Sequence, residues 1–77
     1  MIDYHLSIYR TACNQLYNDT LSERDWDRIN VIRQASLMAI ALEIGVIQEV
    51  GDATLTQAQS DQTLNFIDRY INQEIAA

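Results

Sequence analysis

The sequence predicts an all-α fold: a three-helix antiparallel bundle with a long central helix, assembling as a helical homodimer. Apolar residues recur at helical spacing along the chain, proline is absent, and glycine occurs only twice. The 77 residues suffice for a single domain, 1–77, and a chain of this size buries only about 60–65% of its unfolded surface. With one cysteine and no metal-binding motif, stability must come from helix packing and self-association.

The first predicted helix spans residues 3–18. Asp3 is its expected N-cap, because a carboxylate there accepts hydrogen bonds from the free amides of the first turn. One face of this helix is apolar and consists of Ile2, Leu6, Tyr9, Cys13, Leu16 and Tyr17. Tyr4 and Ile8 point away from that face, so we expect something else to cover them.

The second predicted helix spans residues 21–50. Residues 20–23 have the capping-box sequence TLSE, and Gly51 fits the C′ residue after the last turn. Apolar side chains form two arcs on opposite sides of this helix, which predicts a central, buried helix. One arc comprises Trp26, Ile29, Leu37, Ile40, Ile44 and Ile47, and the other Val31, Ala35, Met38, Ala39, Leu42 and Val46. Gly45 is the weak point, where the helix kinks or ends if it is not continuous.

The third predicted helix spans residues 54–75. It begins at a second possible capping box, TLTQ at 54–57. Its main seam is formed by Leu64, Ile67, Ile71 and Ile75, and Phe66 and Tyr70 widen it. Because the predicted connections are short, we expect the three helices to pack as antiparallel neighbours with the second helix in the middle.

The second helix has more apolar perimeter than two shorter helices cover, which predicts a further interface. A symmetric homodimer is the commonest solution for a small helical chain, and a different protein docked on the same surface is the alternative. The candidate partner or dimer interface consists of Tyr4, Ile8, Trp26, Leu42, Val46, Phe66 and Tyr70. Asp61 and Asp68 are the candidate acidic rim of that interface.

The charge of the chain indicates which classes of binding partner are disfavoured. Eleven carboxylates and five arginines give a net charge of −6, and lysine is absent. Binding to nucleic acid or to an anionic membrane depends on clustered Lys and Arg, so the sequence disfavours both. The acidity suits a basic protein partner and, in the extreme, a protein that mimics nucleic acid. The first residues are neither basic nor followed by an apolar core, and the apolar stretch 34–50 contains two glutamates, so we expect a cytoplasmic protein without a membrane span.

No residue pattern indicates catalysis. His5 and Asp3 are two positions apart, and residues at that spacing do not face each other on a helix. Cys13 lies on the apolar seam, where a small buried side chain is expected. Glu43 interrupts an apolar stretch, and we expect it to pair with an arginine at a helix seam. The sequence therefore predicts no enzyme activity, no catalytic, cofactor-binding or metal site, and no cofactor.

Residues 41–46 (ALEIGV) resemble the turn of a helix-turn-helix motif. The resemblance covers about ten residues, 40–50, and the segment that would enter the DNA groove (47–50) carries no Arg or Lys. A nucleic-acid-binding regulator using this degenerate motif is the alternative function.

The function that we expect is a small acidic protein-interaction module: a regulator, adaptor or inhibitor that occludes or bridges a protein partner. Its size and acidity suit a protein encoded by a phage or another mobile element. The sequence names neither the partner nor the pathway, and it leaves open whether a small-molecule pocket lies between the helices.

Overall fold

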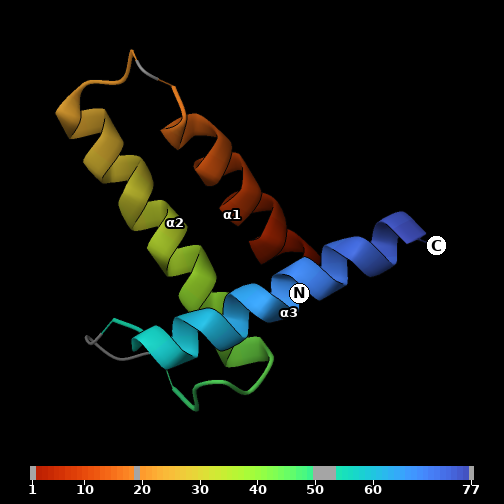
Figure 1. The fold of residues 1–77 in the computed structure, drawn as a ribbon. Helices are drawn as coiled ribbons and strands as arrows, with labels where there is room; N and C mark the ends of the chain where they lie inside the picture. Colours follow the sequence, from red (N-terminus) through yellow and green to blue (C-terminus); the bar gives the residue numbers. More distant parts are fainter. Residues whose placement is uncertain (1, 19, 50–53, 77) are drawn as a thin grey trace.

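The computed structural model describes residues 2–18, 20–49 and 54–76, the last four of these as backbone only. The described residues form three α-helices, α1 (Ile2–Leu16), α2 (Glu23–Glu43) and α3 (Gln57–Ala76), and they contain no β-strand. Figure 1 shows α1 and α2 side by side, joined at one end by a short connection, with α3 across their other end. The predicted all-helical class is thus confirmed.

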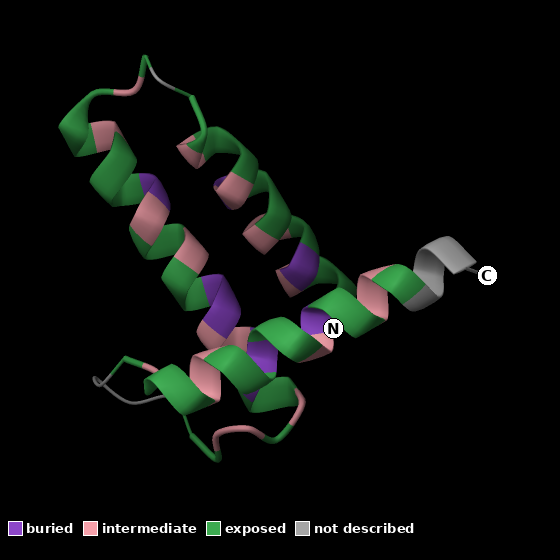
Figure 2. Ribbon diagram, in the orientation of Figure 1, coloured by how far each residue is buried: buried purple, intermediate pink, exposed green. Residues whose placement is uncertain are grey.

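The core lies where the three helices meet. Leu6 of α1, Leu37 and Ile40 of α2, and Ile67 of α3 form one buried cluster, and Ile40 is only 1% exposed. Partly buried side chains pack around it: Tyr9, Ile44, Leu55, Tyr70 and Ile71. Figure 2 shows the buried residues concentrated at the end of the α1–α2 pair that contacts α3. Burial is sparser toward the connection between α1 and α2.

The start of α2 differs from the predicted capping box at 20–23. Ser22, not Thr20, is the N-cap, and its Oγ accepts a hydrogen bond from the backbone N–H of Asp25 (3.2 Å). Thr20 instead donates its N–H and its hydroxyl to Asn18 Oδ1 (3.0 and 2.8 Å). The asparagine side chain therefore orders the turn, and the helix begins at Glu23, two residues later than the predicted start at 21.

The end of α2 corrects the prediction of a helix reaching Val50. The helix ends at Glu43, and Gly45 adopts a left-handed conformation with φ of +82°. Its N–H donates to the Leu42 carbonyl (3.3 Å), while the Val46 N–H donates to the Ala41 carbonyl (2.9 Å). These two bonds form a Schellman motif, which satisfies carbonyls that a longer helix would have bonded. Gly45 is therefore the C′ residue. Gly51, predicted for that role, lies outside the described residues, as does Val50.

The capping box at the start of α3 lies two residues later than the predicted one at 54–57, and the helix begins at Gln57 instead of the predicted 54. Thr56 Oγ1 accepts from the Gln59 N–H (3.2 Å), and Gln59 Oε1 accepts from the Thr56 N–H (2.9 Å). These reciprocal bonds are a complete capping box over 56–59. The observed bounds of α1 and the end of α3 differ from the predicted helices 3–18 and 54–75 by two residues or fewer, which is within ordinary end fraying.

Candidate interaction surface

Residues 31–42 of α2 place apolar side chains on the side of the helix opposite the core. We call this surface the outward α2 face. It consists of Val31, Ile32, Ala35, Met38, Ala39 and Leu42. On the other side of the same helix, Ile29, Leu37, Ile40 and Ala41 are buried. The 3.6-residue repeat of the helix puts these two sets on opposite faces, so α1 and α3 cover one apolar face and leave the other to solvent.

The outward α2 face is exposed along its length. Val31 is 63% exposed, Ile32 45% and Leu42 39%, while Ala35 is also exposed. Met38 and Ala39 are half-buried. Single exposed apolar side chains are ordinary on protein surfaces, but a contiguous stripe over about three helical turns is typical of surfaces that another protein covers.

On the α1 side, this face borders a shallow groove. Ile32 lines the groove together with Ile8 and Ala12 of α1, and its volume is about 190 Å³. Ile8 was one of the predicted interface residues, and it is half-buried here. The groove therefore extends the apolar surface of α2 onto α1.

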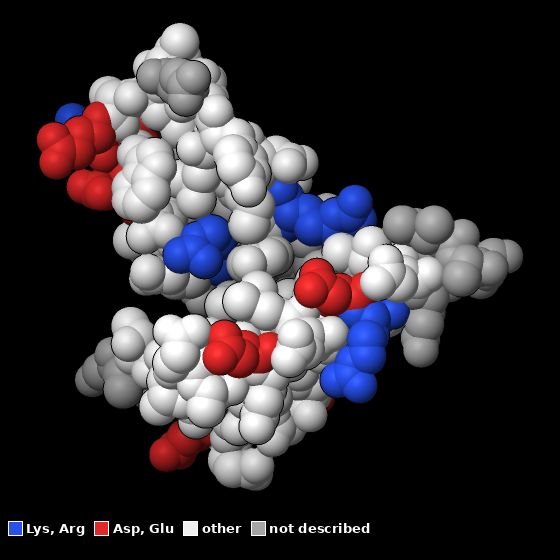
Figure 3. Space-filling view, viewed as in Figure 1, with Lys and Arg blue, Asp and Glu red and all other residues white. Residues whose placement is uncertain are grey.

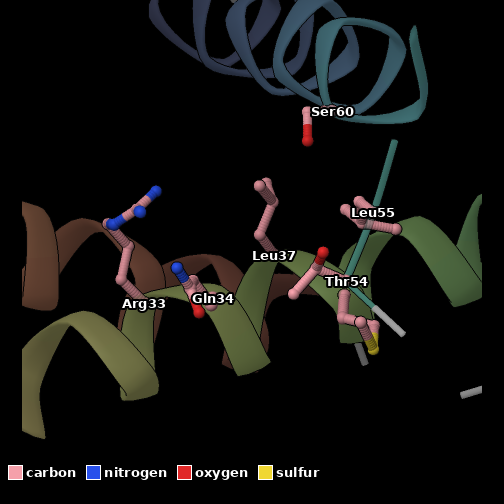
Figure 4. Close-up of a pocket in the computed structure, with 7 residues that line it drawn as sticks. Arg33, Gln34, Leu37, Thr54, Leu55 and Ser60 are labelled. Carbon is pink, nitrogen blue, oxygen red and sulfur yellow. The ribbon is translucent and has the colours of Figure 1, made fainter. Parts of the chain in front are cut away.

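On the α3 side, Met38 borders a second groove of about 260 Å³. In Figure 4, Leu37 of α2 points toward Ser60 of α3, and Leu55 closes one end. Arg33, Gln34 and Thr54 add polar groups to the lining. This groove is open and is lined by both polar and apolar side chains. The apolar surface of the outward α2 face therefore ends at the groove and does not continue across it.

Charged side chains mark the two ends of the outward α2 face. Arg24 and Arg28 precede Val31 at helical spacing, and Glu43 ends the helix; all three are exposed. Asp25 lies 3.6 Å from Arg28, a surface ion pair of small energetic value. Figure 3 shows acidic side chains grouped where α2 begins, with the remaining charges scattered over that side of the molecule.

The structure places the predicted interface residues in four separate areas. Leu42 lies on the outward α2 face, Val46 follows in the turn after it, and Ile8 lies in the bordering groove. Trp26 is 43% exposed in the first turn of α2. Tyr4, 60% exposed on α1, contacts the His5 ring edge-on.

Phe66 and Tyr70 form the fourth area, on α3. Their rings are stacked with centroids 6.0 Å apart, and the Tyr70 hydroxyl donates a hydrogen bond to Asp3 Oδ1 of α1. Both side chains are half-buried. Phe66 and Tyr70 therefore lie at the contact between α1 and α3 and are also partly exposed at the surface. Asp3, the predicted N-cap of the first helix, here accepts a hydrogen bond from a different helix.

The predicted acidic rim lies on α3 and not beside the outward α2 face. Asp61 and Asp68 are both exposed, and their separation of seven positions puts them on one side of the helix. Asp61 Oδ1 accepts a hydrogen bond from Gln57 Nε2 (2.9 Å). These carboxylates form an acidic surface that is separate from the outward α2 face.

Tyr9, Cys13 and Arg33 form a small polar group between α1 and α2. Burial raises the pKa of the Tyr9 phenol above its ordinary value; the neighbouring Cys13 acts in the same direction, and the Arg33 guanidinium opposes them. Arg33 also donates to Asn30 Oδ1 from Nε (3.0 Å) and Nη2 (2.9 Å). Because this group lies beside the core, its effect is on stability rather than on a ligand.

The segment that resembles a helix-turn-helix turn has a different geometry. The motif needs a second helix directly after the turn. Residues 44–49 are not helical, and the next described helix begins at Gln57. The short sequence resemblance over 40–50 is therefore not accompanied by a recognition helix in those described residues.

Neither a metal cluster nor a membrane-spanning helix is found in the described residues. In residues 2–18, 20–49 and 54–76, no three His, Cys, Asp or Glu side chains are grouped to hold a metal ion. No helix in these ranges combines the length and apolar character needed to cross a bilayer.

The predicted interface did not include Ile32, which belongs to neither predicted arc, or Val31, which belongs to the arc that the structure leaves exposed. The available signal was the spacing of Val31, Ala35, Met38 and Leu42, which alternates between four and three residues. That spacing is typical of helices that pair with another helix. The same helix carries a second apolar arc, so the spacing alone did not indicate which arc faces outward.

Comparison with known proteins adds no relative. No family model matches the sequence, and neither the curated proteins nor the solved structures include a significant match.

Proposed function

We propose that this chain is a small protein-interaction module that acts as a regulator, adaptor or inhibitor by occluding or bridging a protein partner. The observation that carries the proposal is the outward α2 face, which is apolar over about three turns and exposed at Val31, Ile32 and Leu42. A soluble helical domain gains little from exposing such a stripe unless another protein covers it.

A second copy of the chain is the proposed occupant of this face, which makes the protein a homodimer. A two-fold interface uses the same patch on both subunits, and small helical chains commonly bury surplus apolar surface in this way. The acidic surface around Asp61 and Asp68 stays available in such a dimer, and we assign the contact with a basic partner protein to it.

Light scattering over a range of protein concentrations tests this proposal. We expect the mass of a dimer for the unmodified chain and of a monomer for Val31→Asp, since a buried, unpaired carboxylate strongly disfavours the interface. Leu64→Asp is the control on another helix, because Leu64 is also exposed, at 37% against 63% for Val31, but lies on α3. It should remain dimeric. Circular dichroism should show all three chains equally helical.

A monomer at every concentration would contradict the homodimer and leave a different protein as the occupant of the face. Loss of the dimer in both variants would show that added charge, and not the position on α2, disrupts association.

A mobility-shift assay at low salt separates this function from nucleic-acid binding. We expect no shift with duplex or single-stranded DNA or RNA, because a net charge of −6 repels phosphates most strongly where salt screens least. A salt-sensitive shift would favour the alternative regulator instead.

A further inference from the structure

We infer that two copies pair through α2 in opposite directions, with Val31 of each chain level with the partner's Leu42. This inference rests on the proposed self-association and specifies its geometry. Three observations carry it: the spacing of the exposed residues, the charges at the two ends of their line, and the order of side-chain sizes along it, with the two smaller apolar residues first and the two larger ones last.

The residue spacing on the exposed side of α2 is typical of paired helices, and it continues past the apolar residues to the arginines at the start of the helix. The line of residues advances by 4, 3, 4, 3 and 4 positions. Its members are Arg24, Arg28, Val31, Ala35, Met38 and Leu42. This alternation keeps side chains on one seam when two helices wind slowly around each other. Since the buried side of α2 is occupied by contacts with α1 and α3, this seam is available to a partner.

The charges determine the direction of pairing. The line begins with Arg24 and Arg28, whereas Glu43 stands directly after its last member. Parallel pairing would place like charges together at both ends. Pairing in opposite directions places the arginines of one chain near the partner's Glu43, which is electrostatically favourable at both ends of the interface. It also aligns the two helix dipoles antiparallel, which is the favourable arrangement.

The acidic residues of the first turn do not change this result. Glu23, Asp25 and Asp27 lie to either side of the line on the helix surface, and Asp25 contacts Arg28 within its own chain. Glu43 lies at the flank of the line as well, so only the arginines stand on the seam itself, and their contact with the partner's Glu43 is made at its edge.

Side-chain sizes determine the register. If the two-fold axis passes midway between positions 35 and 38, Ala35 of one chain meets the partner's Met38, and Val31 meets the partner's Leu42. Each pair then joins a smaller with a larger side chain, which allows close packing at an interaxial distance of about 8–10 Å. Arg28 then lies level with the partner's position 45, about 3 Å along the axis from its Glu43, within reach of the long arginine side chain.

Disulfide formation between introduced cysteines tests the direction and register. The background chain carries Cys13→Ser, and the single variants are Val31→Cys and Leu42→Cys. In the inferred dimer the two copies of position 31 are about 16 Å apart along the axis, too far for a disulfide. We expect little cross-linking of either variant alone and a covalent dimer in the equimolar mixture. Leu64→Cys, mixed with each, is the control for random collision.

The outcomes separate this inference from the proposed self-association. Cross-linking of Val31→Cys alone and of Leu42→Cys alone would indicate parallel pairing and overturn the inference while the dimer stands. A dimer by light scattering without cross-links in the mixture would place the interface elsewhere and overturn it as well. A monomer by light scattering would overturn the self-association itself.

A charge exchange gives an independent readout in solution. Arg28→Glu should raise the dimer dissociation constant about two- to fivefold, the size expected for an exposed ion pair. The double variant Arg28→Glu with Glu43→Arg should restore the dissociation constant, because opposite-direction pairing brings the exchanged charges together again. Failure of the double variant to recover would contradict the inferred direction.

Discussion

The two sides of α2 have nearly the same chemistry and very different environments. Ile29, Leu37 and Ile40 are at most 8% exposed, whereas Val31 and Leu42 on the other side are 63% and 39% exposed. Both sides follow helical spacing. The difference therefore comes from what the other helices reach: α1 lies along one side of α2, and α3 crosses its end. In a chain this short, apolar composition alone does not decide which surface becomes core.

The largest expected difference between the two sides is in the free energy of unfolding. Ile40→Ala should lower it by about 2–5 kcal/mol, because it opens a cavity in the buried cluster. Val31→Ala should change the stability of the monomer by no more than about 0.5 kcal/mol, since the side chain is exposed and alanine favours helices. Urea denaturation of dilute protein measures both.

If Ile40→Ala does not fold, Ile40→Val replaces it in the experiment. Its expected loss of unfolding free energy is about 0.5–1.5 kcal/mol. Equal losses at positions 31 and 40 would mean that the outward side of α2 is part of the monomer core, and would invalidate the comparison.

The class of fold could be predicted from the sequence because local rules govern it. Helical periodicity and the absence of proline predict the three helices, and the buried residues Leu6, Leu37, Ile40 and Ile67 all belong to predicted apolar seams. The choice between the two arcs of α2 depends on the lengths and crossing of α1 and α3. Those are tertiary properties, so local spacing cannot supply them.

The next effect in size concerns the turn that ends the outward α2 face. Gly45→Ala should cost about 1–2 kcal/mol of unfolding free energy, because φ of +82° is unfavourable for a residue with a Cβ atom. An added Cβ would meet no atom within 4 Å, so the cost is conformational and not steric.

Gly45→Asn is the matched variant, since asparagine tolerates this conformation better than alanine. Thermal or urea unfolding should rank the chains glycine, asparagine, alanine in decreasing stability. An alanine variant as stable as the unmodified chain would mean that α2 continues past Glu43, as the sequence had predicted.

The helix ends were harder to predict than the helices, for a specific reason. At both predicted capping boxes two residues of suitable chemistry stand two positions apart: Thr20 and Ser22, then Thr54 and Thr56. In both places the later residue is the cap. At the end of α2, Gly45 and Gly51 both satisfied the rule for a C′ residue, and the apolar run beyond Gly45 favoured the wrong one.

The smallest expected effect is a pH dependence on the inner side of α2. Burial, reinforced by Cys13, raises the pKa of Tyr9, so folding favours its neutral form. The resulting stability is fully present below the unfolded value of 10.0 and is lost as pH rises through the higher folded value. The chain with Tyr9 should therefore lose thermal stability relative to Tyr9→Phe above about pH 10.

Melting temperatures of both chains between pH 8 and 11 measure this effect. Both chains also carry Cys13→Ser, because Cys13 interacts with the Tyr9 phenol and its contribution would otherwise differ between the two chains. A constant difference over this range would show that the Tyr9 hydroxyl titrates equally in the folded and unfolded chains.

Trp26 gives the chain an optical probe at a useful place. It is the only tryptophan of the sequence, and it lies 43% exposed in the first turn of α2, at the end of the helix pair that α3 does not contact. Its fluorescence therefore reports that end, whereas far-ultraviolet circular dichroism reports all three helices. Coincidence or separation of the two melting curves measures whether the α1–α2 end opens as an independent unit.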